Sequence, residues 1–408
     1  MTGTGTLGFC RHRLQRVNHF IQTQYIDTGH LPGAHLLISR KGEIAHEFVT
    51  GMQDRERNIP LPDDAIFRIY SMTKPVTSVA ALMLVEQGLL KLDDPVSRYI
   101  PAWHDLTVLG PGGEGSSPEN VRYAPMRIID LFRHTAGLTY DFQRRSAVDA
   151  AYRAKGIGRR HGDLNLAQTV DALSDIPLDF TPGSAWNYSI SIDVLGHVIE
   201  CLSGQSLDIF LQSRIFGPLG MEDTAFWVAG DKKHRFTASY KLDDGHVSLQ
   251  EDPANSDYLR APTFLSGGGG LVSTAHDYHR FATMLTEGGR FGQTRLLSAK
   301  MVRLMGSNHL PDKQEIGALS LSTYSEAIYP GMGFGLGVAV VVDEVRTLMP
   351  CSVGEMHWGG MASTLFWADP QEELCVTFMT QLIPSNAYPI RRELRTLVYA
   401  SLVSDLHA

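Results

Sequence analysis

A serine and a lysine lie three residues apart at the start of an apolar stretch, RIYSMTKPVTSVAALMLVEQG (residues 68–88). Pro75 lacks an N–H and is tolerated only in the first turn of a helix, so a helix is predicted to begin close to Ser71. Ser71 and Lys74 then share one face of that helix. The helix macrodipole and burial would both lower the pKa of Lys74, and a neutral lysine could accept the serine proton. The pair predicts a nucleophile with its base, against the alternative of an N-cap serine beside a solvated lysine.

The S-x-x-K spacing is the nucleophile motif of penicillin-binding proteins and β-lactamases. Further stretches carry the likeness: LDDPVSRYIP (92–101), LFRHTAGL (131–138), PLGMEDTAF (218–226) and GGGGLVSTAHDYHRFATML (267–285). Together they resemble the class C β-lactamase branch of the penicillin-recognising serine hydrolase superfamily, over residues 30 to 385. The resemblance implies an α+β, β-lactamase/transpeptidase-like fold with its active site in a cleft between two domains.

The second motif of that branch is Y-x-N, whose tyrosine works with the lysine as general base and proton shuttle. The sequence here is Tyr188-Ser189-Ile190, so Tyr188 matches the tyrosine while Ile190 replaces the asparagine. A phenol with a pKa near 10 needs a neighbouring cation for this role, and Lys74 could provide it. The Y-S-x pattern is similar to that of family VIII carboxylesterases.

The third motif, K-T-G or H-T-G, is matched by His357-Trp358-Gly359-Gly360. The resemblance implies that His357, Trp358 and Gly359 contact the substrate. It also implies that a backbone N–H, that of Gly360 to within one residue, pairs with the Ser71 N–H as an oxyanion hole. An indole in place of a carboxylate-binding threonine favours a neutral acyl or alcohol group, and W-G-G is again typical of family VIII esterases.

The expected function is a serine carboxylesterase that hydrolyses short-chain esters through an acyl-enzyme on Ser71. Tyr140, directly after HTAGL, is expected in the substrate pocket, with plain packing as the alternative. One rival function is a β-lactamase, DD-peptidase, amide hydrolase or acyltransferase on the same scaffold. Ile190, Trp358 and the missing signal peptide count against the cell-wall roles. A rival of another class is a non-catalytic binding or assembly protein that retains the fold.

The partner that the resemblance implies is a small-molecule ester, and the oligomeric state is left open. A net charge of −8 argues against nucleic-acid binding. The sequence has neither a signal-peptide pattern nor eighteen consecutive apolar residues, so a cytoplasmic location without a membrane segment is expected. The four widely spaced cysteines are expected to be free thiols. No cofactor and no metal are expected, and His276 and His279 are interpreted as exposed helix residues because no third ligand follows them.

Strand signals lie at both ends of the chain. Residues 34–51 predict a hairpin turning at Lys41-Gly42, residues 333–344 and 363–382 predict later strands, and residues 386–403 predict a final helix. Residues 1–80 and 300–408 are therefore expected to form one domain with an antiparallel sheet and flanking helices. Residues 81–299 are expected to form a mainly helical insert, with a Gly/Ser/Pro-rich loop at 109–120.

Overall fold

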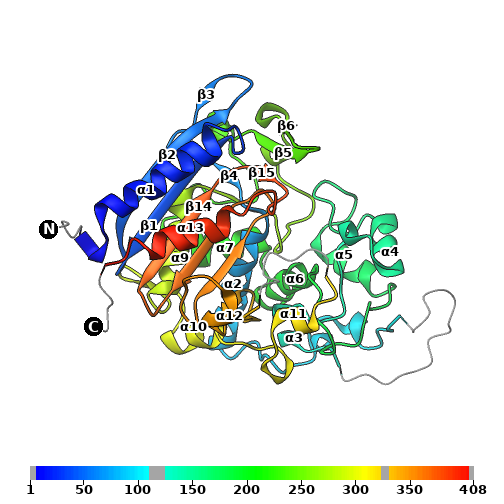
Figure 1. Ribbon diagram of the computed structural model, residues 1–408. Coiled ribbons are helices and arrows are strands. Elements are labelled where there is room, and N and C mark those ends of the chain that lie inside the picture. Colours follow the sequence, from blue (N-terminus) through cyan, green and yellow to red (C-terminus); the bar gives the residue numbers. More distant parts are fainter. Residues whose placement is uncertain (1–5, 110–124, 323–329, 404–408) are drawn as a thin grey trace.

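The computed structural model describes residues 6–109, 125–322 and 330–403 (Figure 1). An eight-stranded antiparallel sheet forms its centre, in the order β10-β11-β12-β13-β14-β1-β2-β3. The strands are β1 (Gly33–Arg40), β2 (Glu43–Asp54), β3 (Ile59–Pro60), β10 (Met332–Phe334), β11 (Ala339–Val341), β12 (Met356–Gly359), β13 (Leu365–Asp369) and β14 (Leu374–Met379). The α+β class and a sheet built from both chain ends are confirmed.

The first strand and the last long strand lie side by side in this sheet. β1 pairs with β14 from His35 opposite Met379 to Arg40 opposite Leu374. On its other edge β1 pairs with β2 through the predicted hairpin. Its turn residues, Lys41 and Gly42, have φ values of +54° and +75°, as a two-residue primed turn requires.

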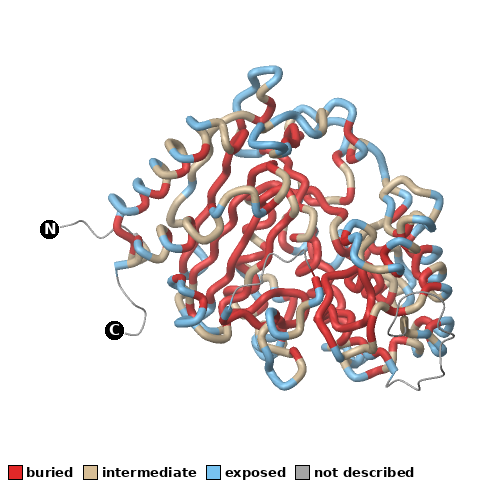
Figure 2. The backbone as a smooth tube through the Cα atoms, turned by 45° about the vertical axis from the view of Figure 1, so that its right-hand side comes forward, coloured by how far each residue is buried: buried red, intermediate tan, exposed pale blue. Residues whose placement is uncertain are grey.

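Helices cover both faces of the sheet, and its central strands β1, β13 and β14 are entirely buried (Figure 2). On one face, α1 (Arg11–Ile21) and the predicted final helix, α13 (Ile390–Tyr399), pack on alternate β1 residues such as Leu36 and Ile38. On the other face, α9 (Ala275–Thr286) contacts β1, β13 and β14. Leu37 points to this side, in the core that also contains Phe281 of α9.

The helix of the opening stretch is α2 (Thr73–Glu86), which is buried on nearly all sides, as predicted, and contacts α6 and α7. Its end is also as expected, because Gly88 adopts a φ of +74° just after the last turn. The other helices of the middle region are α3 (Ile128–Phe132), α4 (Ala147–Lys155), α5 (Leu166–Leu173), α6 (Ser191–Ser203), α7 (Leu207–Leu211) and α8 (Gly217–Leu219).

Two features differ from the predicted division of the chain. α9 falls inside the predicted helical insert but packs on the sheet. The insert also contains β5 (Ser239–Asp243) and β6 (His246–Glu251), which form a small sheet with β15 (Leu382–Ile383). Most of the predicted loop at 109–120 lies outside the described residues.

The remaining short elements connect these layers. They are β4 (Phe67–Arg68) paired with β7 (Val272–Ser273), β8 (Arg290–Phe291) paired with β9 (Thr294–Arg295), α10 (Ala299–Met305), α11 (Ile316–Leu319) and α12 (Glu344–Thr347). All four cysteines are free thiols, as predicted. Among the described helices, none alone has the length and apolarity to cross a bilayer; α6 and the segment Leu207–Leu219 meet these criteria only as a pair, across an 80° bend.

Candidate active site

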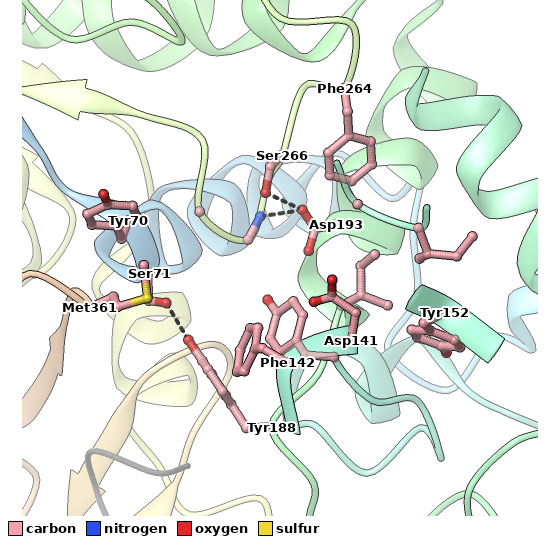
Figure 3. A pocket seen from close by; sticks show the side chains of 16 residues that line it. Tyr70, Ser71, Asp141, Phe142, Tyr152, Tyr188, Asp193, Phe264, Ser266 and Met361 are labelled. Carbon is pink, nitrogen blue, oxygen red and sulfur yellow. Dashed lines mark hydrogen bonds between the residues drawn. The ribbon is translucent and has the colours of Figure 1, made fainter. Parts of the chain in front are cut away.

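Ser71 lies in a short 3-10 turn, Tyr70–Met72, that leads directly into α2. The predicted helix start is therefore correct to within two residues. Tyr70 has a φ of +42°, a conformation that residues other than glycine rarely adopt. Strain of this kind is held by surrounding structure and is common next to reacting groups. The turn leaves Ser71 partly exposed and facing a cavity (Figure 3).

Lys74 is fixed beneath the serine, and its side chain is almost fully buried. Its Nζ donates to Ser71 Oγ at 3.2 Å and to the carbonyl oxygen of Gly268 at 2.6 Å. Because the backbone of Gly268 holds the amine, the amine stays within proton-transfer distance of the serine.

Tyr188 approaches the same serine from the other side of the cavity (Figure 3). Its hydroxyl donates to Ser71 Oγ at 2.5 Å, and Lys74 Nζ lies 4.4 Å from the centre of its ring. Tyr188 precedes α6, and its backbone carbonyl accepts a hydrogen bond from the Gln143 side chain. A hydroxyl, an amine and a phenol are thus brought together from two distant stretches of the chain, an arrangement that can move a proton on and off Ser71.

Asp193 is a buried residue of this site that sequence reasoning missed. Its Oδ1 accepts from Ser266 Oγ at 2.5 Å and from the Gly268 N–H at 3.0 Å (Figure 3). Asp193 therefore fixes the loop whose Gly268 carbonyl accepts a hydrogen bond from Lys74. Burial raises the pKa of Asp193, and the charge of Lys74 opposes that shift. A Cβ on Gly268 would lie within 3 Å of Asp193 and the Tyr140 hydroxyl, which is why this position is a glycine. The available signal was a carboxylate five residues after Tyr188, in the first turn of the following helix.

The cavity in front of Ser71 has a volume of about 260 Å³. Its lining consists of Tyr70, Ser71, Tyr140, Asp141, Phe142, Tyr152, Ile157, Gly158, Tyr188, Ile190, Asp193, Phe264, Ser266, Gly268, Gly269 and Met361. Tyr140 is therefore in the pocket, as the sequence suggested, and its ring stacks on Phe142 at 4.8 Å. Burial, followed by the charge of Asp193, raises the pKa of Tyr140 well above 10. Of the described residues that line the cavity, none is Lys, Arg or His, and two are aspartates.

His357 and Gly359, predicted to contact the substrate, are not among the described residues that line this cavity. Both residues line a separate, smaller cavity that includes Arg391 of α13. The side chain of His357 is only 12% exposed there, and desolvation followed by the charges of nearby arginines lowers its pKa well below 6.5. His357, Trp358 and Gly359 lie inside β12, where the pleat of the strand fixes the direction of the side chains.

Trp358, the third predicted substrate contact, supports the tyrosine and is not among the described residues that line the Ser71 cavity. Its ring lies 5.6 Å from that of Tyr188 and 5.4 Å from that of Phe334, and its side chain is buried. The indole therefore packs against the phenol that meets Ser71.

The Gly360 N–H, predicted for the oxyanion hole, has another acceptor. This N–H donates to the Thr364 carbonyl at 2.9 Å and is not directed at the cavity. Gly360 is required for a different reason, because a Cβ there would lie within 3 Å of the Ile69 carbonyl. The next residue, Met361, lines the cavity beside Ser71 (Figure 3).

Comparisons with known proteins find similar proteins over nearly the whole chain. The family model described as Beta-lactamase matches residues 19–400. Esterase EstB of Burkholderia gladioli is 31% identical over 392 residues, covering 91% of each chain. Protein Rv1367c of Mycobacterium tuberculosis is 34% identical over 364 residues, covering 88% of each chain. A solved structure titled EstCE1, a hydrolase with promiscuous acyltransferase activity, superposes with a TM-score of 0.79 at 27% identity, over 96% of this chain and 99% of that chain.

Proposed function

This chain belongs to the Beta-lactamase family and is a serine hydrolase of the β-lactamase fold, and we propose that it is a carboxylesterase acting on short-chain, neutral esters. The observation that carries the proposal is the meeting of Tyr188 and Lys74 on Ser71 Oγ, at 2.5 and 3.2 Å. The name of EstB and the Y-S-I and W-G-G sequences favour an esterase of the family VIII type.

In the proposed reaction, Ser71 gives its proton to the Lys74/Tyr188 pair while Oγ bonds to the ester carbonyl carbon. The bond from that carbon to the alcohol oxygen then breaks, and the alcohol leaves with the proton returned through Tyr188. Water repeats both steps on the acyl-enzyme and releases the acid. Three cooperating groups of this kind lose most of their benefit when one is removed.

We assign the oxyanion hole to the backbone N–H groups of Ser71 and Met361. Ser71 lies at the start of α2, where the helix macrodipole favours negative charge. Met361 replaces the predicted Gly360 because the Gly360 N–H already donates to Thr364. Donors fixed in this way stabilise charge that develops only in the transition state.

The charge of the cavity supports a neutral substrate. β-Lactams and cell-wall peptides present a carboxylate, which an enzyme binds with a cation or a donor pair. The described lining of this cavity has no cationic side chain and includes Asp141 and Asp193. Aromatic rings such as those of Tyr140, Phe142 and Phe264 suit a small apolar acyl or alcohol group.

The test compares Ser71→Ala with Ser266→Ala, since both serines line the cavity but only Ser71 meets Lys74. Ser71→Ala is expected to lose hydrolysis of p-nitrophenyl butyrate and labelling by a fluorophosphonate probe, while its circular dichroism stays native. Ser266→Ala is expected to keep the label. Esterase activity in folded Ser71→Ala would refute the assignment, and faster turnover of nitrocefin than of the ester would favour the β-lactamase alternative.

Acyl transfer is a second candidate function, favoured by the likeness to EstCE1, a hydrolase with promiscuous acyltransferase activity. An alcohol in place of water would take the acyl group from Ser71 and form a new ester. Product analysis with p-nitrophenyl butyrate and added methanol would detect methyl butyrate. Butyrate alone would exclude this activity toward methanol.

A further inference from the structure

The two histidines of α9 do not lie in the exposed setting predicted for them. His279 is buried, and its Nδ1 lies 3.0 Å from Thr377 Oγ1 of β14. His276, one turn earlier, is partly exposed and reaches Glu47 of β2. α9 itself offers no third ligand. Because α9 packs against β1 and β14 of the sheet (Figure 1), Glu47 of the neighbouring strand β2 comes within reach of His276.

Three side chains from three elements meet at this place. The side chains of His35 and Leu37 lie on the same face of β1, the face that α9 covers. Glu47 pairs with Leu37 across β1 and β2. Glu47 Oε1 is 2.9 Å from His35 Nε2 and 3.2 Å from His276 Nε2. The ligand atoms of all three residues lie within 4.8 Å of one another.

Hydrogen bonding alone leaves this cluster unsatisfied. His35 is fully buried, and its Nδ1 has no hydrogen-bond partner among the described residues. When Nε2 of His35 carries the proton, Nδ1 is a buried acceptor without a donor. When Nδ1 carries the proton, the lone pair of Nε2 faces the carboxylate oxygen of Glu47. In the second tautomer a cation between Nε2 and Oε1 turns this repulsion into coordination, and the Nδ1 N–H is left without an acceptor among the described residues.

We propose that His35, Glu47 and His276 form a binding site for one divalent transition-metal ion, with Zn²⁺ as the best match. Two imidazole nitrogens and one carboxylate oxygen are a known zinc ligand set. Ligands at 2.0–2.1 Å in a tetrahedron are about 3.3 Å apart, close to the 2.9 and 3.2 Å observed here. Glu47 and His276 are each 37% exposed, so a water molecule can reach the fourth position.

The proposed site is separate from the esterase site. None of its three residues lines the cavity of Ser71. A bound ion would join the N-terminal hairpin to α9, two parts of the chain that are far apart in sequence. Metal binding would therefore stabilise the native chain by mass action, whether or not the esterase proposal is correct.

The test uses untagged full-length protein, freed of metal with EDTA and dialysed. Titration with ZnCl₂ in a calorimeter is expected to show one ion per chain, and excess zinc is expected to raise the melting temperature. Glu47→Gln and His276→Gln, both at partly exposed positions, should each weaken zinc binding by about tenfold or more and reduce the thermal shift.

His46→Gln is the matched control. His46 adjoins Glu47 on β2, but its Nε2 lies 2.6 Å from Asn18 of α1, on the other face of the sheet. This variant should bind zinc as the wild type does. Absence of stoichiometric binding by the wild type, or equal affinity in the Glu47 and His276 variants, would overturn the proposal.

Discussion

Tyr188→Phe is the sharpest test of the proposed chemistry, because it removes one oxygen atom and leaves the packing of the ring. The hydroxyl donates to Ser71 Oγ at 2.5 Å. The ring itself lies 5.0 Å from that of His134 and 5.6 Å from that of Trp358, contacts that phenylalanine can keep. The substitution should therefore lower kcat strongly and the free energy of unfolding only slightly.

The expected loss in kcat is about 10²- to 10⁴-fold, the usual contribution of a positioned acid or base, or about 3 to 5 kcal/mol of transition-state stabilisation. The free energy of unfolding should fall by only about 0.5 to 1.5 kcal/mol, the net contribution of one hydrogen bond. KM should change little, because the hydroxyl acts on the serine and not on the bound ester.

Steady-state hydrolysis of p-nitrophenyl butyrate and urea unfolding would measure both quantities. Tyr140→Phe is the control, since Tyr140 lines the same cavity but its hydroxyl interacts with Asp193. That variant should keep kcat within about tenfold of wild type. A Tyr188→Phe enzyme with kcat in the same range would refute the role of the phenol.

Three further predictions concern the backbone, the buried charge and the cavity. Gly360→Ala should destabilise the fold by about 1 to 3 kcal/mol and reduce activity, because the new Cβ lies within 3 Å of neighbouring atoms. Urea unfolding and ester hydrolysis would measure both effects. Gly230→Ala, with open space around the new Cβ, is the control and should show neither effect. Burial, then the charge of Lys74, lowers the pKa of His134 well below 6.5. The contribution of His134 to stability is therefore present above about pH 6.5 and is lost as the pH falls toward the lowered pKa. Urea unfolding at about pH 7.5 and 5 should show a smaller loss of stability at the lower pH for His134→Gln than for the wild type, and an equal loss would contradict this. Asp141→Asn should raise kcat/KM for an ester with a carboxylate on its acyl chain by roughly fivefold relative to a neutral ester, the effect of about 1 kcal/mol of charge repulsion; an unchanged ratio would remove Asp141 from substrate selection.

The features predicted correctly from the sequence depend on short-range chemistry. Pro75 and Gly88 bound α2, and Lys41-Gly42 turns the first hairpin, because each residue type restricts its own backbone. Ser71 and Lys74 meet because three residues make nearly one turn of a helix.

The features that sequence reasoning missed depend on contacts between distant segments. The hydrogen bond from Gly360 to Thr364 engages the N–H that was predicted for the oxyanion hole, and no residue type indicates that bond. Asp193 is tied to Lys74 through Ser266 and Gly268, which come more than 70 residues later in the chain. His276 of α9 likewise meets Glu47 only when the helix packs on the sheet.

The pairing of β1 with β14 also has a consequence for biosynthesis. His35 finds its partner Met379 only about 340 residues later in the chain. At 5–20 residues per second, a ribosome needs on the order of 20 to 70 s to make that interval. Throughout that time one edge of β1 has backbone donors and acceptors without its native partner, the condition under which strands pair wrongly. The central sheet, and with it the wall of the cavity at Met361, is completed only when the last strands emerge.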